Sequence, residues 1–224
     1  MDYATVSRNY CNAVLESDGD AAMRVIEGAL ADGLAPEKLV FDVVLPALNQ
    51  MLHKIVADDQ ATLSQHFITA KVSGEVVEKL ISRFRTLPSS SGVVVMGTAF
   101  GDFHGLGRKI VSGCLRANMF TVHDAGLNAS PARFVDLAEE TGAMVIGVSS
   151  MMMHTTVGDE GPKGVRAELH RRGLENKIRL VVGGAPYLFD SALYRKVGAD
   201  GWAADAFSAV TTIGALCESG VPHA

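Results

Sequence analysis

The sequence predicts an α/β protein in two parts: a bundle of four helices followed by a doubly wound, five-stranded parallel sheet. After residue 92, short apolar runs alternate with amphipathic stretches, which is the pattern of successive strand and helix units. Before residue 86, apolar residues recur at helical spacing, and a Pro/Ser-containing segment separates the two patterns. We therefore expect a helical domain over 1–86, a linker over 87–91 and a sheet domain over 92–224.

Turn and cap signals divide the first part into helices with short connections. A break at residues 17–20, Ser-Asp-Gly-Asp, has the composition of a turn followed by an N-cap. Pro36 stands where a first helical turn tolerates proline, whereas Pro46 lies inside the apolar run 37–55 and predicts a kink or a restart. A long amphipathic pattern over 62–84 completes a small antiparallel bundle.

The second part contains five predicted strand and helix units. The strands are expected at 93–96, 119–122, 143–148 and 180–182, with a weak one near Trp202, and the helices at 108–117, 131–140, 164–172, 191–197 and 204–217.

Composition narrows the class of function. The 224 residues are 48% hydrophobic and 20% charged, and the formal net charge of −5 is mixed along the chain, which argues against a basic nucleic-acid-binding face. The three cysteines are far apart, so we expect neither a zinc site nor a disulfide framework. We see no signal peptide and no uninterrupted transmembrane run, and we expect a cytoplasmic protein with no membrane partner.

A glycine-rich loop with a histidine follows the first predicted strand. Residues 101–107 read Gly-Asp-Phe-His-Gly-Leu-Gly, and ligands of open α/β sheets bind at the carboxyl ends of the strands. The spacing Asp-x-His-x-x-Gly resembles the signature of cobalamin-binding domains in corrinoid methyl carriers and methionine synthase. Two further elements resemble that family. Ser149-Ser150-Met151 follows Gly107 after 41 intervening residues, and Gly183-Gly184 follows the fourth strand. The likeness spans about residues 92–210.

The resemblance implies a Rossmann-like domain that binds cobalamin or a related corrinoid, with His104 as the metal ligand. In the family the histidine coordinates cobalt from below and replaces the cofactor's own base. A neutral imidazole suits such a metal, and its second nitrogen needs an acceptor that fixes the tautomer. Asp102 is the predicted acceptor and Ser149 the next hydroxyl in the relay, so these three residues form the predicted catalytic set.

The remaining predicted cofactor contacts follow the same three elements and the helical part. Glycines leave room for a bulky nucleotide tail close to the backbone, and the Gly183-Gly184 pair flanks that tail. The predicted contacts are Thr98, Gly101, Asp102, Phe103, His104, Gly105, Leu106, Gly107, Ser149, Met151, Met153, Thr155, Gly183, Gly184, Trp202 and Ala203, with His66 and Phe67 from the bundle.

The resemblance implies a methyl carrier, a subunit of a methyltransferase system rather than a complete enzyme. Its expected partners are a substrate-specific methyltransferase, an acceptor methyltransferase such as one that serves a folate, and a reductive activator. Two departures leave an alternative open. Met153 and His154 interrupt the threonine run common after the second element, and Gln65-His66 is faintly similar to the Glu-His of cobalamin photoreceptors. The alternative is a cobalamin-dependent sensor that acts through a partner protein; a mutase-type small subunit fits the helical front part less well.

Overall fold

The computed structural model describes residues 2–48, 50, 63–83 and 90–219. The chain divides into two compact units, Met1–Ser89 with Gly113–Met119, and Ser90–Ser112 with Phe120–Ala224. Because residues 84–89 lie outside the described part, the expected limits of the linker remain a prediction. Within the described residues, no helix has the length and apolar character needed to cross a membrane.

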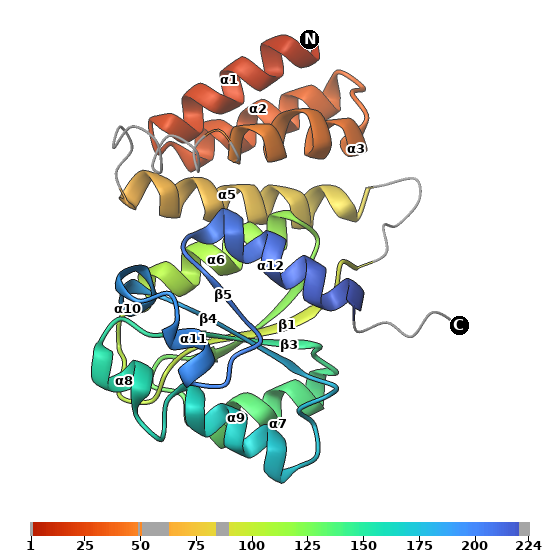
Figure 1. Ribbon diagram of the computed structural model, residues 1–224. Coiled ribbons are helices and arrows are strands. Elements are labelled where there is room, and N and C mark those ends of the chain that lie inside the picture. Colours follow the sequence, from red (N-terminus) through yellow and green to blue (C-terminus); the bar gives the residue numbers. More distant parts are fainter. Residues whose placement is uncertain (1, 49, 51–62, 84–89, 220–224) are drawn as a thin grey trace. The chain divides into compact units, whose positions relative to one another are not determined.

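The helical unit begins with two capped helices (Figure 1). Helix α1 (Tyr3–Leu15) starts at Asp2, whose carboxylate accepts from the Thr5 N–H at 2.7 Å. Helix α2 (Gly19–Ala31) starts at Asp18, which accepts from the Ala21 N–H at 2.8 Å. Such side-chain caps satisfy amide groups that the first helical turn leaves without partners. The predicted break before α2 is therefore present.

Proline explains an irregular turn in the third helical segment. Helix α3 (Pro36–Leu39) passes directly into a π-helical turn, η1 (Val40–Val44), and the chain continues as α-helix from Leu45 to Leu48. Pro46 has no N–H to donate, and its ring would crowd the carbonyl four residues earlier in a regular α-helix. The wider turn just before Pro46 relieves that conflict, so the predicted kink takes the form of a π-bulge.

The last described helix of this unit is α5 (Leu63–Ile81), and the apolar sides of the four segments form one core. The completely buried side chains of this core include Val6, Tyr10, Ala22, Leu39, Val43, Leu48, Ala70, Val76 and Leu80.

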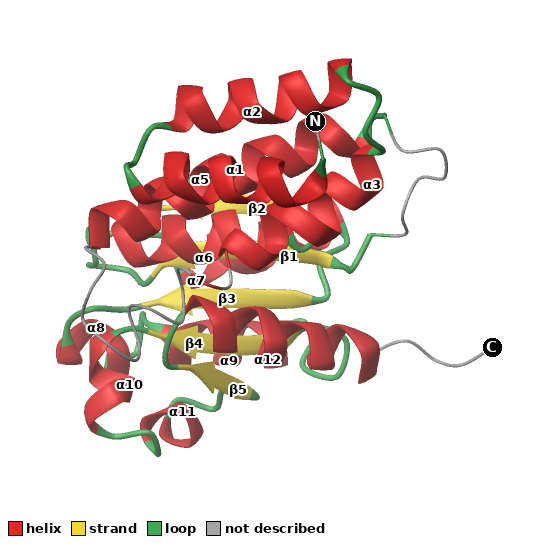
Figure 2. Ribbon diagram, turned by 90° about the horizontal axis from the view of Figure 1, so that it is seen from above, coloured by secondary structure: helices red, strands yellow, loops and turns green. Residues whose placement is uncertain are grey.

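The sheet unit is a five-stranded, all-parallel sheet in the order β2-β1-β3-β4-β5 (Figure 2). The strands are β1 (Val93–Thr98), β2 (Thr121–Gly126), β3 (Val145–Ser149), β4 (Arg179–Gly183) and β5 (Gly201–Ala203). Helices α6 (Leu106–Ala117) and α12 (Ala206–Ser219) lie on one side of the sheet, and α7 (Pro131–Thr141) and α9 (Pro162–Arg171) on the other (Figure 1). This is the predicted doubly wound, Rossmann-like arrangement.

Three short helices, α8 (Met153–Val157), α10 (Ala185–Phe189) and α11 (Leu193–Lys196), follow strands β3 and β4. The sequence predicts a helix near α11 but neither α8 nor α10. Each of those two helices has only five residues, too few to show helical periodicity.

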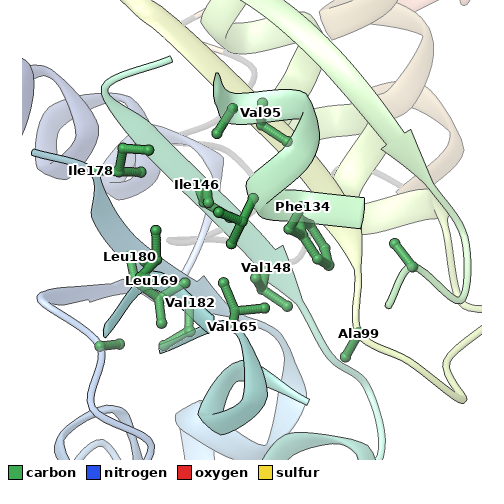
Figure 3. Packing of buried hydrophobic residues seen from close by; sticks show 14 of the residues in the cluster. Val95, Ala99, Phe134, Ile146, Val148, Val165, Leu169, Ile178, Leu180 and Val182 are labelled. Atoms are coloured by element: carbon green, nitrogen blue, oxygen red, sulfur yellow. The ribbon is translucent and has the colours of Figure 1, made fainter. Parts of the chain in front are cut away.

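Large side chains fill the space between the sheet and the α7/α9 layer. Val95, Ile146, Val148, Leu180 and Val182 point from alternate strand positions into one buried cluster (Figure 3). Helices α7 and α9 complete this cluster with Phe134, Val135, Val165 and Leu169. Since strand side chains alternate between faces, the intervening residues point toward α12.

Candidate functional site

The sheet order places the β1–α6 and β3–α8 loops side by side. Strands β1 and β3 are neighbours in a 2-1-3-4-5 sheet, so the crossovers leave them in opposite directions and a crevice opens at their carboxyl ends. The backbones of the two strand ends are joined, because the Ala99 N–H donates to the Ser149 carbonyl at 2.9 Å. The first two predicted elements, near residues 104 and 149, therefore meet at one edge of the sheet.

Buried hydrogen bonds fix the loop that carries the histidine. The Thr98 hydroxyl donates to the Asp102 carbonyl and accepts from the Asn128 N–H, each at 2.9 Å. The Asn128 side-chain oxygen accepts from the Gly101 N–H at 2.7 Å, and Gly101 itself has φ of +78°, a conformation that favours glycine. Asn128 was not among the predicted site residues, because its contacts bridge two loops that are distant in sequence.

Asp102 and His104 form a pair of a buried carboxylate and an exposed imidazole. The Asp102 Oδ1 atom accepts from the His104 backbone N–H at 2.8 Å and lies 2.9 Å from His104 Nδ1. The Asp102 side chain is completely buried, whereas 59% of the His104 side chain is exposed. With Nδ1 as the donor, Nε2 carries a lone pair, and no hydrogen bond to Nε2 is found among the described residues. Asp102 therefore orients the imidazole, and the role of His104 as a metal ligand remains a prediction.

The second oxygen of Asp102 is held by the β3–α8 segment. Asp102 Oδ2 accepts from the Met151 N–H at 2.5 Å and lies 3.3 Å from the Thr155 hydroxyl. Burial alone raises the pKa of Asp102, but the hydrogen bonds from Met151 and His104 together hold that pKa below its ordinary value. Asp102 is consequently an anion that accepts four hydrogen bonds.

Thr155, and not Ser149, supplies the hydroxyl that contacts Asp102. Ser149 is the last residue of β3 and its side chain follows the strand's alternation, whereas Thr155 lies on the short helix α8 beside the carboxylate. Thr155 thus makes a contact with Asp102 that the sequence does not predict, and a role for Ser149 in the relay remains a prediction. The same hydroxyl also lies 2.9 Å from the Met152 carbonyl, so its single proton is shared between two acceptors.

Small residues form a register row across four strands at the same edge. Thr98, Ser149, Gly183 and Ala203 pair successively along β1, β3, β4 and β5. A Cβ placed on Gly183 would meet only the Ala203 carbonyl oxygen, at 3.2 Å. We call this row, on the face toward α12, the small-residue trough.

Trp202 does not join these residues. It packs against the apolar cluster on the α7/α9 face, because it alternates with Ala203 along β5. Its contact with a cofactor remains a prediction. Gly184, beside the trough, has φ of +121°, and a Cβ there would overlap the Ser150 carbonyl, so glycine is required by both backbone conformation and close approach.

Exposed apolar side chains occur in the loop that carries His104 and in the loop that follows β3. Phe103, Leu106, Met151 and Met153, all predicted contacts, are between 39% and 66% exposed. Phe100, Leu127 and Met152 are also exposed and were not predicted. Leu127 lies against Gly105, where a Cβ would come within 2.7 Å of its Cδ2, whereas a Cβ on Gly107 would meet nothing within 4 Å. The histidine is thus framed by apolar surface suited to a flat, largely apolar macrocycle.

The two predicted contacts from the helical part belong to helix α5, in the other unit. Phe67 is half-buried there, and the side chain of His66 lies outside the described residues. Their contact with a cofactor remains a prediction.

The chemistry of these groups fits a corrinoid. A carboxylate orients the His104 imidazole, exposed apolar side chains lie in the same two loops, and a row of small residues ends the strands. These features are compatible with a corrinoid, and the individual cofactor contacts remain predictions.

Comparison with known proteins supports this assignment. The B12 binding domain family matches residues 92–211. Dimethylamine corrinoid protein 3 of Methanosarcina acetivorans is 30% identical over 210 residues, which cover 89% of this chain and 91% of that protein. The dimethylamine corrinoid protein of Methanosarcina barkeri is 30% identical over 221 residues, 94% of this chain and 96% of that protein.

A solved structure agrees in fold. The methanol:cobalamin methyltransferase complex of Methanosarcina barkeri contains a chain that superposes with a TM-score of 0.71 at 21% identity, covering 96% of this chain and 80% of that one. The fold and site thus define a B12-binding protein. The chain belongs to the B12-binding family, and within it to the corrinoid proteins that carry methyl groups in methyltransferase systems.

Proposed function

We propose that this corrinoid protein holds its cofactor at the carboxyl edge of the sheet, with His104 Nε2 as the lower ligand of cobalt. The observation that carries the proposal is the exposed imidazole whose Nδ1 is fixed by a buried carboxylate. The cofactor's own base, displaced by His104, would enter the small-residue trough between β3–β5 and α12. When bound, the corrinoid supplies the metal centre that accepts and releases the methyl group.

The chain's own residues control the lower ligand. Asp102 keeps Nδ1 protonated and directs the lone pair of Nε2 outward. Through the hydrogen bond at Nδ1, Asp102 would hold the imidazole in this orientation toward the metal that the corrinoid supplies. Thr155 and the Met151 N–H keep the proton off Asp102 by hydrogen bonding to its second oxygen.

Corrinoid proteins work with methyltransferases, and we propose two such partners here. One would load the methyl group from its substrate, and the other would pass it to an acceptor such as a folate, with a reductive activator restoring the metal. The names of the relatives favour a methylamine as the methyl source. In this scheme the substrate is recognised by the partner enzyme, and this chain supplies the carrier.

The proposal is tested by loading the purified protein with cobalamin and recording the Co(II) electron-spin signal with ¹⁵N-labelled histidine. The wild type should bind one corrinoid per chain, with coupling to one protein nitrogen. His104→Ala should fold normally, since its side chain is largely exposed, and should lose that coupling.

His170→Ala is the matched control. His170 is also an exposed histidine whose Nδ1 lies near a carboxylate, that of Glu175 at 3.1 Å, but it is on α9. Its removal should leave the coupling unchanged. Nitrogen coupling that persists in His104→Ala, or failure of the wild type to bind any corrinoid, would refute the assignment.

A further inference from the structure

A second row of the sheet lies directly below the trough. Met96, Gly147, Val181 and Gly201 pair in register one step further from the carboxyl edge, on the same face as Ser149 and Gly183. Helix α12 covers this face, since a Cβ on Gly201 would lie 2.9 Å from the side chain of Thr212. The inner end of the trough is therefore set by this row.

The side chain of Met96 occupies the space above Gly147. A Cβ at Gly147 would overlap the Met96 sulfur and lie 3.1 Å from its terminal methyl group. Gly147 lies in the middle of regular strand β3 and has no positive φ, so its backbone conformation does not call for glycine. The missing side chain at this position makes room for Met96, which is only 5% exposed.

We propose that Met96 is a specificity-determining residue for the nucleotide tail of the corrinoid. The Met96 thioether closes the inner end of the trough. How far this side chain can move away from Gly147 sets the size of the lower base that the trough accepts. The inference rests on the proposed function, in which the displaced base enters this trough.

Methionine suits this role physically. Its unbranched side chain has three rotatable bonds and a polarizable sulfur, so it fills an irregular gap and also adapts to an aromatic ring. The neighbouring Val95 points to the opposite face, where Phe134 and Ile146 enclose it. Large side chains fill the space on that face, whereas on the trough face the flexible side chain of Met96 fills the space above Gly147.

The test compares two corrinoids that differ in the tail. Cobalamin carries a benzimidazole nucleotide, and cobinamide lacks the nucleotide altogether. The wild type should bind cobalamin more tightly than cobinamide. Met96→Phe places a larger and stiffer side chain at the inner end of the trough. It should weaken cobalamin binding by about tenfold, as a moderate steric conflict does, and should leave cobinamide binding unchanged.

Val95→Ala is the matched control, since it alters the adjacent buried residue on the other face. It should lower thermal stability and leave the ratio of the two affinities unchanged. Equal affinity of the wild type for both corrinoids, or equal loss for both in Met96→Phe, would overturn the proposal for Met96. Failure of the wild type to bind either corrinoid would instead refute the proposed function.

A second measurement does not depend on a variant that folds poorly. In protein with ¹³C-labelled methionine methyl groups, Met96→Leu identifies the Met96 signal among the nine methionines. Cobalamin should shift that signal, because an aromatic base would lie against the methyl group, and cobinamide should shift it little. A Met96 signal that does not respond to cobalamin contradicts the inference.

Discussion

The two faces of the sheet are packed in different ways. Toward α7 and α9, valine, isoleucine, leucine and phenylalanine side chains interdigitate in one closed cluster. Toward α12, the positions nearest the carboxyl edge are Ser149, Gly183 and Ala203, followed by Gly147 under the Met96 side chain. Near the carboxyl edge, the strands thus present large side chains toward α7 and α9, the filled face, and small side chains toward α12.

The difference separates stability from binding. A close-packed cluster loses free energy of folding when its atoms are removed, because neighbouring groups do not fully collapse into the space. A trough of small residues buries little apolar surface and so adds little to the free energy of folding. What it provides is volume for a ligand. Substitutions on the two faces should therefore affect different measurements.

Removing a large side chain from the filled face gives the largest expected effect. Phe134→Ala should lower the free energy of unfolding by about 3–5 kcal/mol, because Phe134 is completely buried among strand side chains. Urea denaturation measures this loss. The folded variant should still bind cobalamin with wild-type affinity.

The control for Phe134 is an aromatic residue of the histidine loop. Phe103 is 66% exposed, so Phe103→Ala should change the free energy of unfolding by less than about 0.5 kcal/mol and should weaken corrinoid binding. Comparable destabilisation by the two variants would mean that Phe103 is as important for folding as a side chain of the filled face.

Adding one methyl group to each face should separate stability from binding in the same way. Gly97→Ala would place a Cβ 2.5 Å from the Phe134 ring, and should cost about 1–3 kcal/mol of stability through overpacking. Gly183→Ala meets only a carbonyl oxygen at 3.2 Å, and should cost less stability but weaken cobalamin more than cobinamide. Calorimetry and the two affinities together check this; a Gly183 variant that binds cobalamin normally would contradict the trough.

The sequence predicted the filled face better than the trough for a physical reason. Apolar runs such as 93–96 and 143–148 identify strands because burial of both faces requires continuous hydrophobicity. The face on which Trp202 lies is not evident from the sequence, since a three-residue strand gives too little alternation to assign a side. Gly147 carried no motif at all, because its role depends on the Met96 side chain across the sheet.

The site shows a similar division. The spacing of Asp102 and His104 predicted their pairing, because two residues in one tight loop can contact only in a few ways. The contact between Thr155 and Asp102 is not evident from the sequence, because a five-residue helix between β3 and Gly158 leaves no periodic signal. Asn128 was missed for a different reason, since its hydrogen bonds to the loop span 27 and 30 residues of sequence.

The Thr155 hydroxyl gives a smaller effect than the packing variants. Thr155→Val keeps the shape of the side chain but removes its hydrogen bond to Asp102. It should weaken His104 ligation by about tenfold, which is the lower end of the loss expected when a residue that supports a metal ligand is removed. Ser149→Ala should leave ligation unchanged. Measuring both with cobinamide excludes effects of the trough on the tail, and a larger effect of Ser149→Ala would favour the predicted relay through Ser149.

The smallest effect concerns the outer surface of the filled face and is seen only in acid. On α9, hydrogen bonds from Arg171 and then Arg172 lower the pKa of Glu168 from 4.5 to about 2. A carboxyl whose pKa is lower in the folded state contributes stability above its ordinary pKa and loses it as pH falls through the folded value. Arg172 also bonds to Glu139 of α7, so this group of charges joins the two helices that cover the cluster.

The measurement is the unfolding temperature of the wild type and of Glu168→Gln between pH 6 and pH 2. Glu168→Gln should unfold at a lower temperature above pH 5, and the difference should shrink steadily between pH 5 and pH 2 as the wild-type carboxyl is protonated. Cobalamin affinity at neutral pH should be the same for both, because the trough lies on the other face of the sheet. A temperature difference that persists at pH 2 would assign the contribution of Glu168 to packing, and a change in cobalamin affinity would show that the two faces are coupled.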